Sequence, residues 1–311
     1  MDIAVGSGGT MVRRVGIRTA FAGWALIFAV SASAATVEER IEVAPGVELR
    51  TIESGRPSAP LTVVMIPGWS AGADIWHGQI DRLNATYRVI TFDPRSQGDS
   101  TKTTSGNTPE QRAADLHAML AAKHGARPVL VGWSQAVQDI AAFVTRYGTR
   151  DIAGIVLVDA AVSEGAKGIE ARPKEAAAQF SQFAIYQSAQ EDYLRGMFGF
   201  IISKPQPSGL VDQAVATGMK TPPSIGIAML VADMFGIDRT PALAKIDCPL
   251  LIIAAASSGE LAQQQAEAAV VKNARFVRID DAGHAVFLDQ PERFGTTLST
   301  FLKELNTSTG R

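Results

Sequence analysis

The chain has 311 residues, and its 46% hydrophobic and 19% charged residues are typical of a globular protein and exclude a disordered chain. The 29 Lys and Arg residues nearly balance the 31 Asp and Glu residues, so the formal net charge of −2 indicates neither a nucleic-acid partner nor an anionic membrane surface. The single cysteine, Cys248, excludes an intrachain disulfide and a cysteine-based metal centre. The four histidines lack the spacing of a zinc site. Neither a metal nor an organic cofactor is implied by the sequence.

Residues 1–34 have the pattern of a secretory signal peptide. Three arginines precede an apolar stretch from Ala20 to Val30, which the small-residue cleavage site Ala32-Ser33-Ala34 follows. The apolar stretch is short against the roughly 20 residues of a membrane-spanning helix. We therefore predict cleavage after Ala34 and a periplasmic or secreted mature protein without stable membrane insertion. Met1 and Met11 both stay open as the true start.

Short apolar runs alternate with helical patterns along the rest of the chain. A hairpin is predicted over 42–52, where two short strands flank Ala-Pro-Gly. Apolar runs without polar alternation, which indicate strands buried on both faces, occur at 61–66, 87–92, 128–132, 155–158, 250–254 and 274–279. Helical patterns lie at 109–123, 135–147, 260–271 and 291–305. This alternation predicts an α/β fold with a mostly parallel central sheet flanked by helices.

The interval between the sixth and seventh strands differs from the rest of the chain. No strand pattern occurs there, and a loop of that length is not expected inside a compact domain. We predict a mainly helical cap at 162–240, inserted after the sixth strand, and a core formed by 35–161 and 241–311. Four apolar cap residues are the predicted substrate contacts, with the alternative that they form the cap's own core: Phe183, Tyr186, Met197 and Phe198.

The segment Gly132-Trp133-Ser134-Gln135-Ala136 connects a predicted strand to a predicted helix. A serine on such a turn is exposed above the sheet, and the helix N-terminus stabilises negative charge that develops beside it. The usual pattern is Gly-x-Ser-x-Gly, and Ala136 occupies its last position. The turn indicates a nucleophilic serine, with a helix-capping serine as the alternative.

A histidine follows the last predicted strand, in Asp281-Ala282-Gly283-His284. A loop at that place reaches back over the sheet, and a serine hydroxyl needs such a base to become nucleophilic. His284 is therefore the candidate base, with an ordinary surface imidazole as the alternative.

Taken together, these blocks resemble the α/β-hydrolase fold family over residues 37–306. The other matching blocks are the turn Ile66-Pro67-Gly68-Trp69, the segment 93–100, and the cap. The resemblance implies that Ser134 is the nucleophile and His284 the general base and acid. It also implies an oxyanion hole formed by the backbone N–H groups of Gln135 and Trp69, although this chain lacks the histidine that many members carry in the Pro-Gly-Trp turn.

Two residues are candidates for the acid of the triad. Most family members carry an aspartate after the seventh strand, but residues 254–260 contain no aspartate and only Glu260 as an acid. The spacing Ser257-x-x-Glu260 before a helix also matches a capping box, which would explain Glu260 without catalysis. Asp159 ends the sixth strand, where some members, including haloalkane dehalogenases, place the acid, although many relatives carry a structural aspartate there. The sequence favours Asp159 and keeps Glu260 as the alternative.

The serine excludes a dehalogenase or epoxide hydrolase of this fold, because both need an aspartate nucleophile. We predict an exported serine carboxylesterase that cleaves a small to medium hydrophobic ester through an acyl-enzyme intermediate. The alternatives are another reaction on the same fold (a hydroxynitrile lyase, a perhydrolase or a cofactor-free oxygenase) and a non-catalytic ligand-binding protein. The natural substrate and the oligomeric state stay open.

Overall fold

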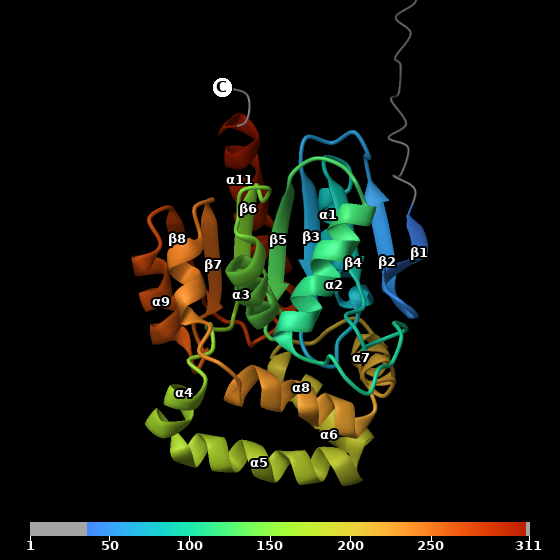
Figure 1. Ribbon diagram of the computed structural model, residues 1–311, viewed down its shortest axis with the longest axis vertical. Helices are drawn as coiled ribbons and strands as arrows, with labels where there is room; N and C mark the ends of the chain where they lie inside the picture. Colours follow the sequence, from blue (N-terminus) through green and yellow to red (C-terminus); the bar gives the residue numbers. More distant parts are fainter. Residues whose placement is uncertain (1–35, 309–311) are drawn as a thin grey trace, which may run out of the picture. The chain divides into compact units, whose positions relative to one another are not determined.

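Eight strands form one sheet in the computed structural model, which describes residues 36–308 (Figure 1). The predicted signal peptide, 1–34, lies outside the described residues. The strands follow the spatial order β1-β2-β4-β3-β5-β6-β7-β8. Their bounds are β1 Val37–Ala44, β2 Val47–Gly55, β3 Thr62–Ile66, β4 Arg88–Phe92, β5 Pro128–Trp133, β6 Gly154–Val158, β7 Leu250–Ala255 and β8 Ala274–Ile279.

The sheet is antiparallel only at the end that holds the hairpin. β1 pairs antiparallel with β2, and β2 pairs antiparallel with β4, whereas every pair from β4 to β8 is parallel. The predicted mostly parallel sheet is confirmed. Since parallel strands all end at the same edge, the loops after β3, β4, β5, β6, β7 and β8 meet there.

Both faces of the sheet are covered by helices. Side chains alternate between the faces of a strand, so Val63 and Met65 join a core cluster with α1 and α11, whereas Val64 and Ile66 join a second cluster with α2 and α3. The covering helices are α1 His77–Leu83, α2 Pro109–Ala122, α3 Ala136–Tyr147, α9 Leu261–Val270, α10 Val286–Asp289 and α11 Pro291–Ser308, with the 3-10 turns η1 Ala73–Trp76 and η2 Thr240–Lys245.

Five helices lie between β6 and β7, in the interval where the sequence predicted helical structure (Figure 1). They are α4 Ala166–Ala171, α5 Pro173–Ser188, α6 Gln190–Ile201, α7 Leu210–Gly218 and α8 Pro223–Phe235. We call residues 162–240 the inserted segment. Its buried side chains Tyr186, Phe198 and Met229 belong to the same core cluster as α1 and α11, so the segment packs onto the sheet domain through apolar contacts. That it acts as a separate cap domain stays a prediction.

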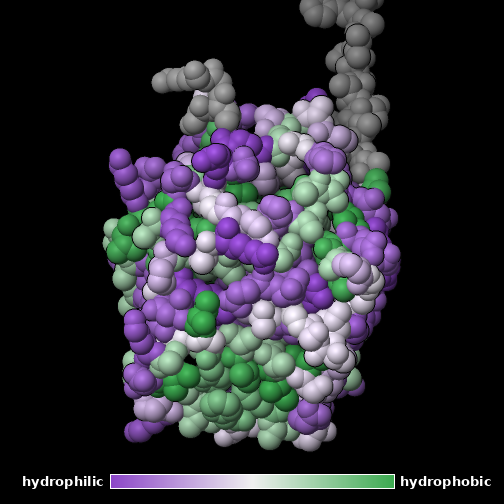
Figure 2. Space-filling model, viewed as in Figure 1, coloured by the Kyte–Doolittle hydropathy of each residue, from purple (hydrophilic) through white to green (hydrophobic). Residues whose placement is uncertain are grey.

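The inserted segment carries apolar side chains on its outer surface. Figure 2 shows them gathered over α5 and α8, and the exposed ones on these helices include Phe180, Ile185 and Val231. Within residues 36–308, no helix combines the length and the apolar character needed to cross a membrane.

Candidate active site

Backbone strain is concentrated at the edge of the sheet where the parallel strands end. Five described residues other than glycine have a positive φ, and each follows the end of a different strand: Ser70 (56°), Ser96 (64°), Ser134 (58°), Asp159 (49°) and Asp281 (58°). Such conformations are costly for most residues with a Cβ, and they cluster at functional sites. The strained edge is therefore the first place to look for chemistry.

Ser134 lies on a tight turn between β5 and α3. Its N–H donates to the carbonyl of Val158 at 3.0 Å, and its own carbonyl accepts from Val137 N–H at 2.9 Å. A Cβ on Gly132 would come within 2.6 Å of Ile140 Cδ1 and 3.1 Å of the Ala136 carbonyl oxygen, so glycine here lets strand and helix approach closely. Ala136, two residues after the serine, is fully buried, and its single methyl group is accommodated where the usual pattern has glycine.

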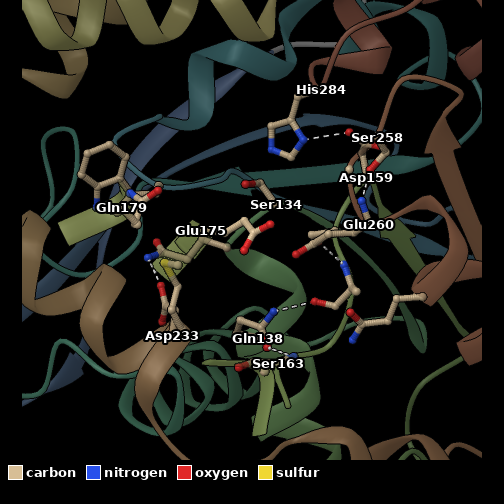
Figure 3. Close-up of a pocket in the computed structure, with 18 of the residues that line it drawn as sticks. Ser134, Gln138, Asp159, Ser163, Glu175, Gln179, Asp233, Ser258, Glu260 and His284 are labelled. Carbon is tan, nitrogen blue, oxygen red and sulfur yellow. Dashed lines mark hydrogen bonds and ion pairs between the residues drawn. The ribbon is translucent and has the colours of Figure 1, made fainter. Parts of the chain in front are cut away.

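His284 is held beside Ser134 by a buried aspartate. Its Nδ1 lies 2.8 Å from Asp159 Oδ2, and the Asp159 side chain is only 1% exposed. The other carboxylate oxygen of Asp159 accepts from Ala255 N–H at 2.7 Å. Figure 3 shows the imidazole between Ser134 and Asp159. A carboxylate at Nδ1 holds the tautomer whose Nε2 is free to accept a proton from the serine.

Glu260, the alternative acid, contacts a different group. Its Oε2 accepts from Ala161 N–H at 2.9 Å, and in the described part of the chain no hydrogen bond joins it to His284. The capping-box interpretation is wrong, because Glu260 makes no side-chain cap and Ser257 Oγ donates to Ala282 O at 2.8 Å. β6 and β7 are neighbours in the sheet, so a side chain at the start of α9 reaches the loop after β6.

The loop after β4 supports the neighbouring turns. Asp93 accepts from Ala73 N–H and from Asp99 N–H, each at 2.7 Å. A Cβ on Gly98, which has a φ of +46°, would lie 2.3 Å from Asp93 Oδ2. This segment is therefore a scaffold that holds other loops in place.

The two backbone groups predicted for the oxyanion hole lie on the loops that adjoin Ser134. Trp69 follows β3 and Gln135 follows Ser134, and both residues line the same cavity as Ser134 and His284. Their N–H groups have no acceptor among the described residues. Both side chains are engaged, since Trp69 Nε1 donates to Gly226 O at 2.9 Å and Gln135 Nε2 donates to Asp233.

The cavity in front of Ser134 has a volume of about 1250 Å³ and is bounded by the strand ends and the inserted segment. Its apolar wall includes Phe200, Leu230, Met234 and Phe235. Polar side chains also face it, and Figure 3 shows Glu175 and Gln179 of α5 among them. A mostly apolar wall with a few polar side chains is the usual form of a small-molecule site.

The four residues predicted as substrate contacts do not line this cavity. Tyr186 and Phe198 are buried in the core, and Met197 packs against it. Phe183 contacts the ring of Phe180, with the centroids 5.5 Å apart. The structure contradicts that prediction, because Tyr186, Met197 and Phe198 pack into the core cluster shared with the sheet domain and Phe183 packs against Phe180 of the same helix. The alternative, a core of the cap's own, does not describe Tyr186 or Phe198 either, since their cluster includes α1 and α11.

A buried charge network that sequence reasoning missed lies beside the cavity. Arg112 of α2 donates from Nε to Asp139 at 2.8 Å and from Nη2 to Asp233 at 2.7 Å. The pKa of Asp139 is raised to about 7, and the pKa of Asp233 is also raised, because burial outweighs the lowering effect of the Arg112 guanidinium on both carboxyl groups. One sequence signal was available: Asp233 is the only charged residue of α8.

The part of the chain that the structure describes contains no group of three or more His, Cys, Asp or Glu residues placed to hold a metal ion.

Comparison with known proteins agrees with this architecture. A family profile described as the alpha/beta hydrolase family matches residues 63–296. A non-heme chloroperoxidase of Kitasatospora aureofaciens is 26% identical over 80% of this chain and 93% of its own length. A bifunctional esterase/perhydrolase of Acinetobacter calcoaceticus is 24% identical over 83% of this chain and 97% of its own. A shorter match, 35% identical over 97 residues, to a putative non-heme chloroperoxidase of Synechocystis spans about a third (35%) of that protein.

The crystal structure of a putative aryl esterase from Burkholderia cenocepacia is also similar. It superimposes with a TM-score of 0.74 at 25% identity, covering 87% of this chain and all (100%) of that one. Relatives of this chain are thus haloperoxidases and esterases with the same fold.

Proposed function

The chain belongs to the alpha/beta hydrolase family, and from this premise we propose that it is an exported serine hydrolase that cleaves esters through an acyl-enzyme intermediate. The observation that carries the proposal is the arrangement at the strand ends. A strained serine faces the cavity beside a histidine whose Nδ1 lies 2.8 Å from a buried aspartate. Three groups in these roles are what acyl transfer to serine requires.

The proposed reaction has two halves. Ser134 Oγ attacks the ester carbonyl carbon while His284 takes its proton, and Asp159 stabilises the imidazolium that forms. The N–H groups of Trp69 and Gln135 donate to the carbonyl oxygen as it becomes negative. His284 then protonates the departing alcohol. In the second half, water attacks the acyl-serine, with His284 first accepting its proton and then returning a proton to Ser134.

The cavity supports an ester with an apolar acyl or alcohol part. Its volume of about 1250 Å³ and its wall of Phe200, Leu230, Met234 and Phe235 provide room and apolar surface for such a group. The polar side chains of Glu175 and Gln179 offer hydrogen-bond partners to a substituent.

Hydrolysis of p-nitrophenyl esters of increasing chain length by the protein spanning 35–311 tests the proposal. We expect turnover that Ser134→Ala abolishes, together with covalent labelling of the wild type alone by a fluorophosphonate. The chain length at which kcat/KM peaks then measures the acyl pocket. Equal rates for wild type and Ser134→Ala on every ester would overturn the proposal.

A second reaction at the same serine is favoured by the names of two relatives, the chloroperoxidase and the esterase/perhydrolase. Hydrogen peroxide in place of water would attack the acyl-serine and release a peracid and free serine. Peracid formation from an acetate ester and hydrogen peroxide measures this. We expect it to depend on Ser134, and a peracid yield no higher than that of Ser134→Ala would exclude it.

A further inference from the structure

Both residues of the proposed oxyanion hole are tied to the same helix of the inserted segment. The indole Nε1 of Trp69 donates to the carbonyl of Gly226 at 2.9 Å. The side-chain amide of Gln135 donates to the carboxylate of Asp233. Gly226 and Asp233 both belong to α8, seven positions apart on that helix. Two loops that are distant in the sequence are therefore fixed to one rigid element.

Gln97 joins the same two loops from the side of the sheet. Its Oε1 accepts from the N–H of Ser70, the strained residue next to Trp69. Its Nε2 lies 3.4 Å from Gln135 Oε1, to which it donates. The side chain is fully buried, with 0% exposure. A continuous line of hydrogen bonds thus runs from Ser70 through Gln97 and Gln135 to Asp233.

An ion pair with Arg112 holds Asp233, the residue of α8 at which this line of hydrogen bonds ends. Arg112 donates to Asp233 at 2.7 Å and to Asp139 at 2.8 Å. Arg112 belongs to α2 and Asp139 to α3, the helix that begins directly after Gln135. Hydrogen bonds between ionised groups are stronger than neutral ones and fix the geometry of both partners. These ion pairs therefore fix the position of α8 relative to α2 and to α3, the helix that follows the nucleophile.

We propose that α8 positions the oxyanion hole, with Gln97 and Asp233 as positioning residues for acyl transfer. The inference rests on the proposed function. An oxyanion hole is effective only when its donors are held in advance at the place where the negative charge develops. The Trp69 N–H belongs to the loop after β3, and the Gln135 N–H belongs to the turn that opens α3. The side chains of both residues are held by α8, and the side chain of Gln135 is also held by Gln97. Acyl transfer is then fast only while α8 is packed against the sheet domain.

Three substitutions test this without removing either backbone donor. Trp69→Phe deletes the indole N–H, Gln97→Met deletes both amide contacts, and Asp233→Asn removes the charge from the end of the line. On a p-nitrophenyl ester we expect kcat to fall about 10- to 100-fold while KM stays within about threefold, because the oxyanion contact strengthens in the transition state. Labelling of Ser134 by a fluorophosphonate should slow by a similar factor.

Lys220→Met is the matched control. Lys220 pairs with Asp99 at 2.7 Å and also links the inserted segment to the sheet domain, but its contact lies outside the line of hydrogen bonds. Its kcat should stay within about twofold of the wild type. Circular dichroism and the melting temperature show whether each variant is folded. If Asp233→Asn does not fold, Trp69→Phe and Gln97→Met carry the test, because neither touches Arg112.

The outcomes separate this inference from the proposed function. A wild type without Ser134-dependent ester hydrolysis would overturn both. An active wild type whose folded variants at positions 69, 97 and 233 keep kcat within twofold would overturn the positioning role alone. Equal losses in these variants and in Lys220→Met would also overturn it, because any loosening of the inserted segment would then have the same effect.

Discussion

Two carboxylates lie close to the loop after β6, and they differ in what they contact. Asp159 reaches His284 Nδ1 at 2.8 Å, whereas Glu260 accepts from a backbone N–H of the loop. We expect Asp159→Asn to lower kcat by roughly 10³- to 10⁴-fold, because the imidazole loses its correct tautomer and its counter-charge. Glu260→Gln, which keeps an oxygen acceptor, should lower kcat less than about tenfold. Steady-state kinetics on one ester decides between them, and the reverse order would make Glu260 the acid.

Glu267 is a buried carboxyl group outside the proposed chemistry. Oε1 accepts from Val162 N–H at 2.9 Å, and Oε2 has no hydrogen-bond partner among the described residues. The pKa of Glu267 is raised from 4.5 to about 8, chiefly by burial and in smaller part by the nearby carboxylates Glu260 and Glu164. The folded state therefore binds this proton at neutral pH, where the unfolded chain does not.

A raised carboxyl pKa predicts a loss of stability as the pH rises. The contribution of Glu267 is fully present below about pH 4.5 and is lost as the pH rises through about 8. We expect the free energy of unfolding of the wild type to fall between pH 6 and pH 9 by about 2–3 kcal/mol more than that of Glu267→Gln, which stays neutral, because each pH unit below the folded pKa costs about 1.4 kcal/mol. Urea denaturation at both pH values measures the difference. Parallel pH profiles for the two proteins would show that Glu267 is ionised in the folded state at pH 6.

At the scale of helices and strands, the local sequence pattern predicted an element where the burial of that element determines its composition. The apolar runs predicted β3 to β7, because strands buried on both faces are composed almost entirely of apolar residues. The run at 274–279 also forms a strand, β8, but this is the edge strand and most of its residues are only half-buried, so the expected burial on both faces is wrong there. The short helices α1 and α10 were not predicted, since seven and four residues are too few for a periodic pattern. The substrate contacts were wrong for another reason. Which side of α5 or α6 faces the cavity is set by contacts with distant elements, and Tyr186 turned toward Trp69 instead.

Three helices meet at one buried guanidinium. Arg112 of α2 is paired with Asp139 of α3 and Asp233 of α8, and all three side chains are almost fully buried. Arg112→Met removes the guanidinium that is hydrogen-bonded to both carboxylates and leaves only the charge of Arg239 nearby, so we expect a loss of about 3–5 kcal/mol in the free energy of unfolding. Asp139→Asn leaves Arg112 with Asp233 and should cost less. Urea unfolding of both variants measures this, and a loss below 1 kcal/mol for Arg112→Met would mean that the carboxylates become neutral at little cost.

At the scale of the whole molecule, the topology of the sheet assembles the site. Trp69, Ser134, Asp159 and His284 follow four different strands, and parallel strands bring all four loops to one edge. Motifs at strand ends were therefore enough to predict Ser134 beside His284. The same motifs did not predict the positions of Gln97 or Asp233, because the residues around a buried amide or carboxylate in the sequence do not indicate its hydrogen-bond partner. The sequence did not decide between Asp159 and Glu260 as the acid for the same reason. Which of the two contacts His284 depends on which loop reaches the imidazole.

Export remains a proposal, and the start of the fold makes it testable. The predicted cleavage point after Ala34 lies just before β1, whose first residue is Val37, so cleavage there leaves every described helix and strand intact. Expressed from Met1 in a Gram-negative host, the protein should appear in the periplasm with an intact mass that corresponds to residues 35–311. The processed protein should hydrolyse esters as fast as the same chain produced directly from residue 35. Arg13→Ala combined with Arg14→Ala weakens the basic segment and should keep unprocessed chains in the cytoplasm. A periplasmic form that retains residues 1–34, or a wild type found only in the cytoplasm, would contradict the proposal.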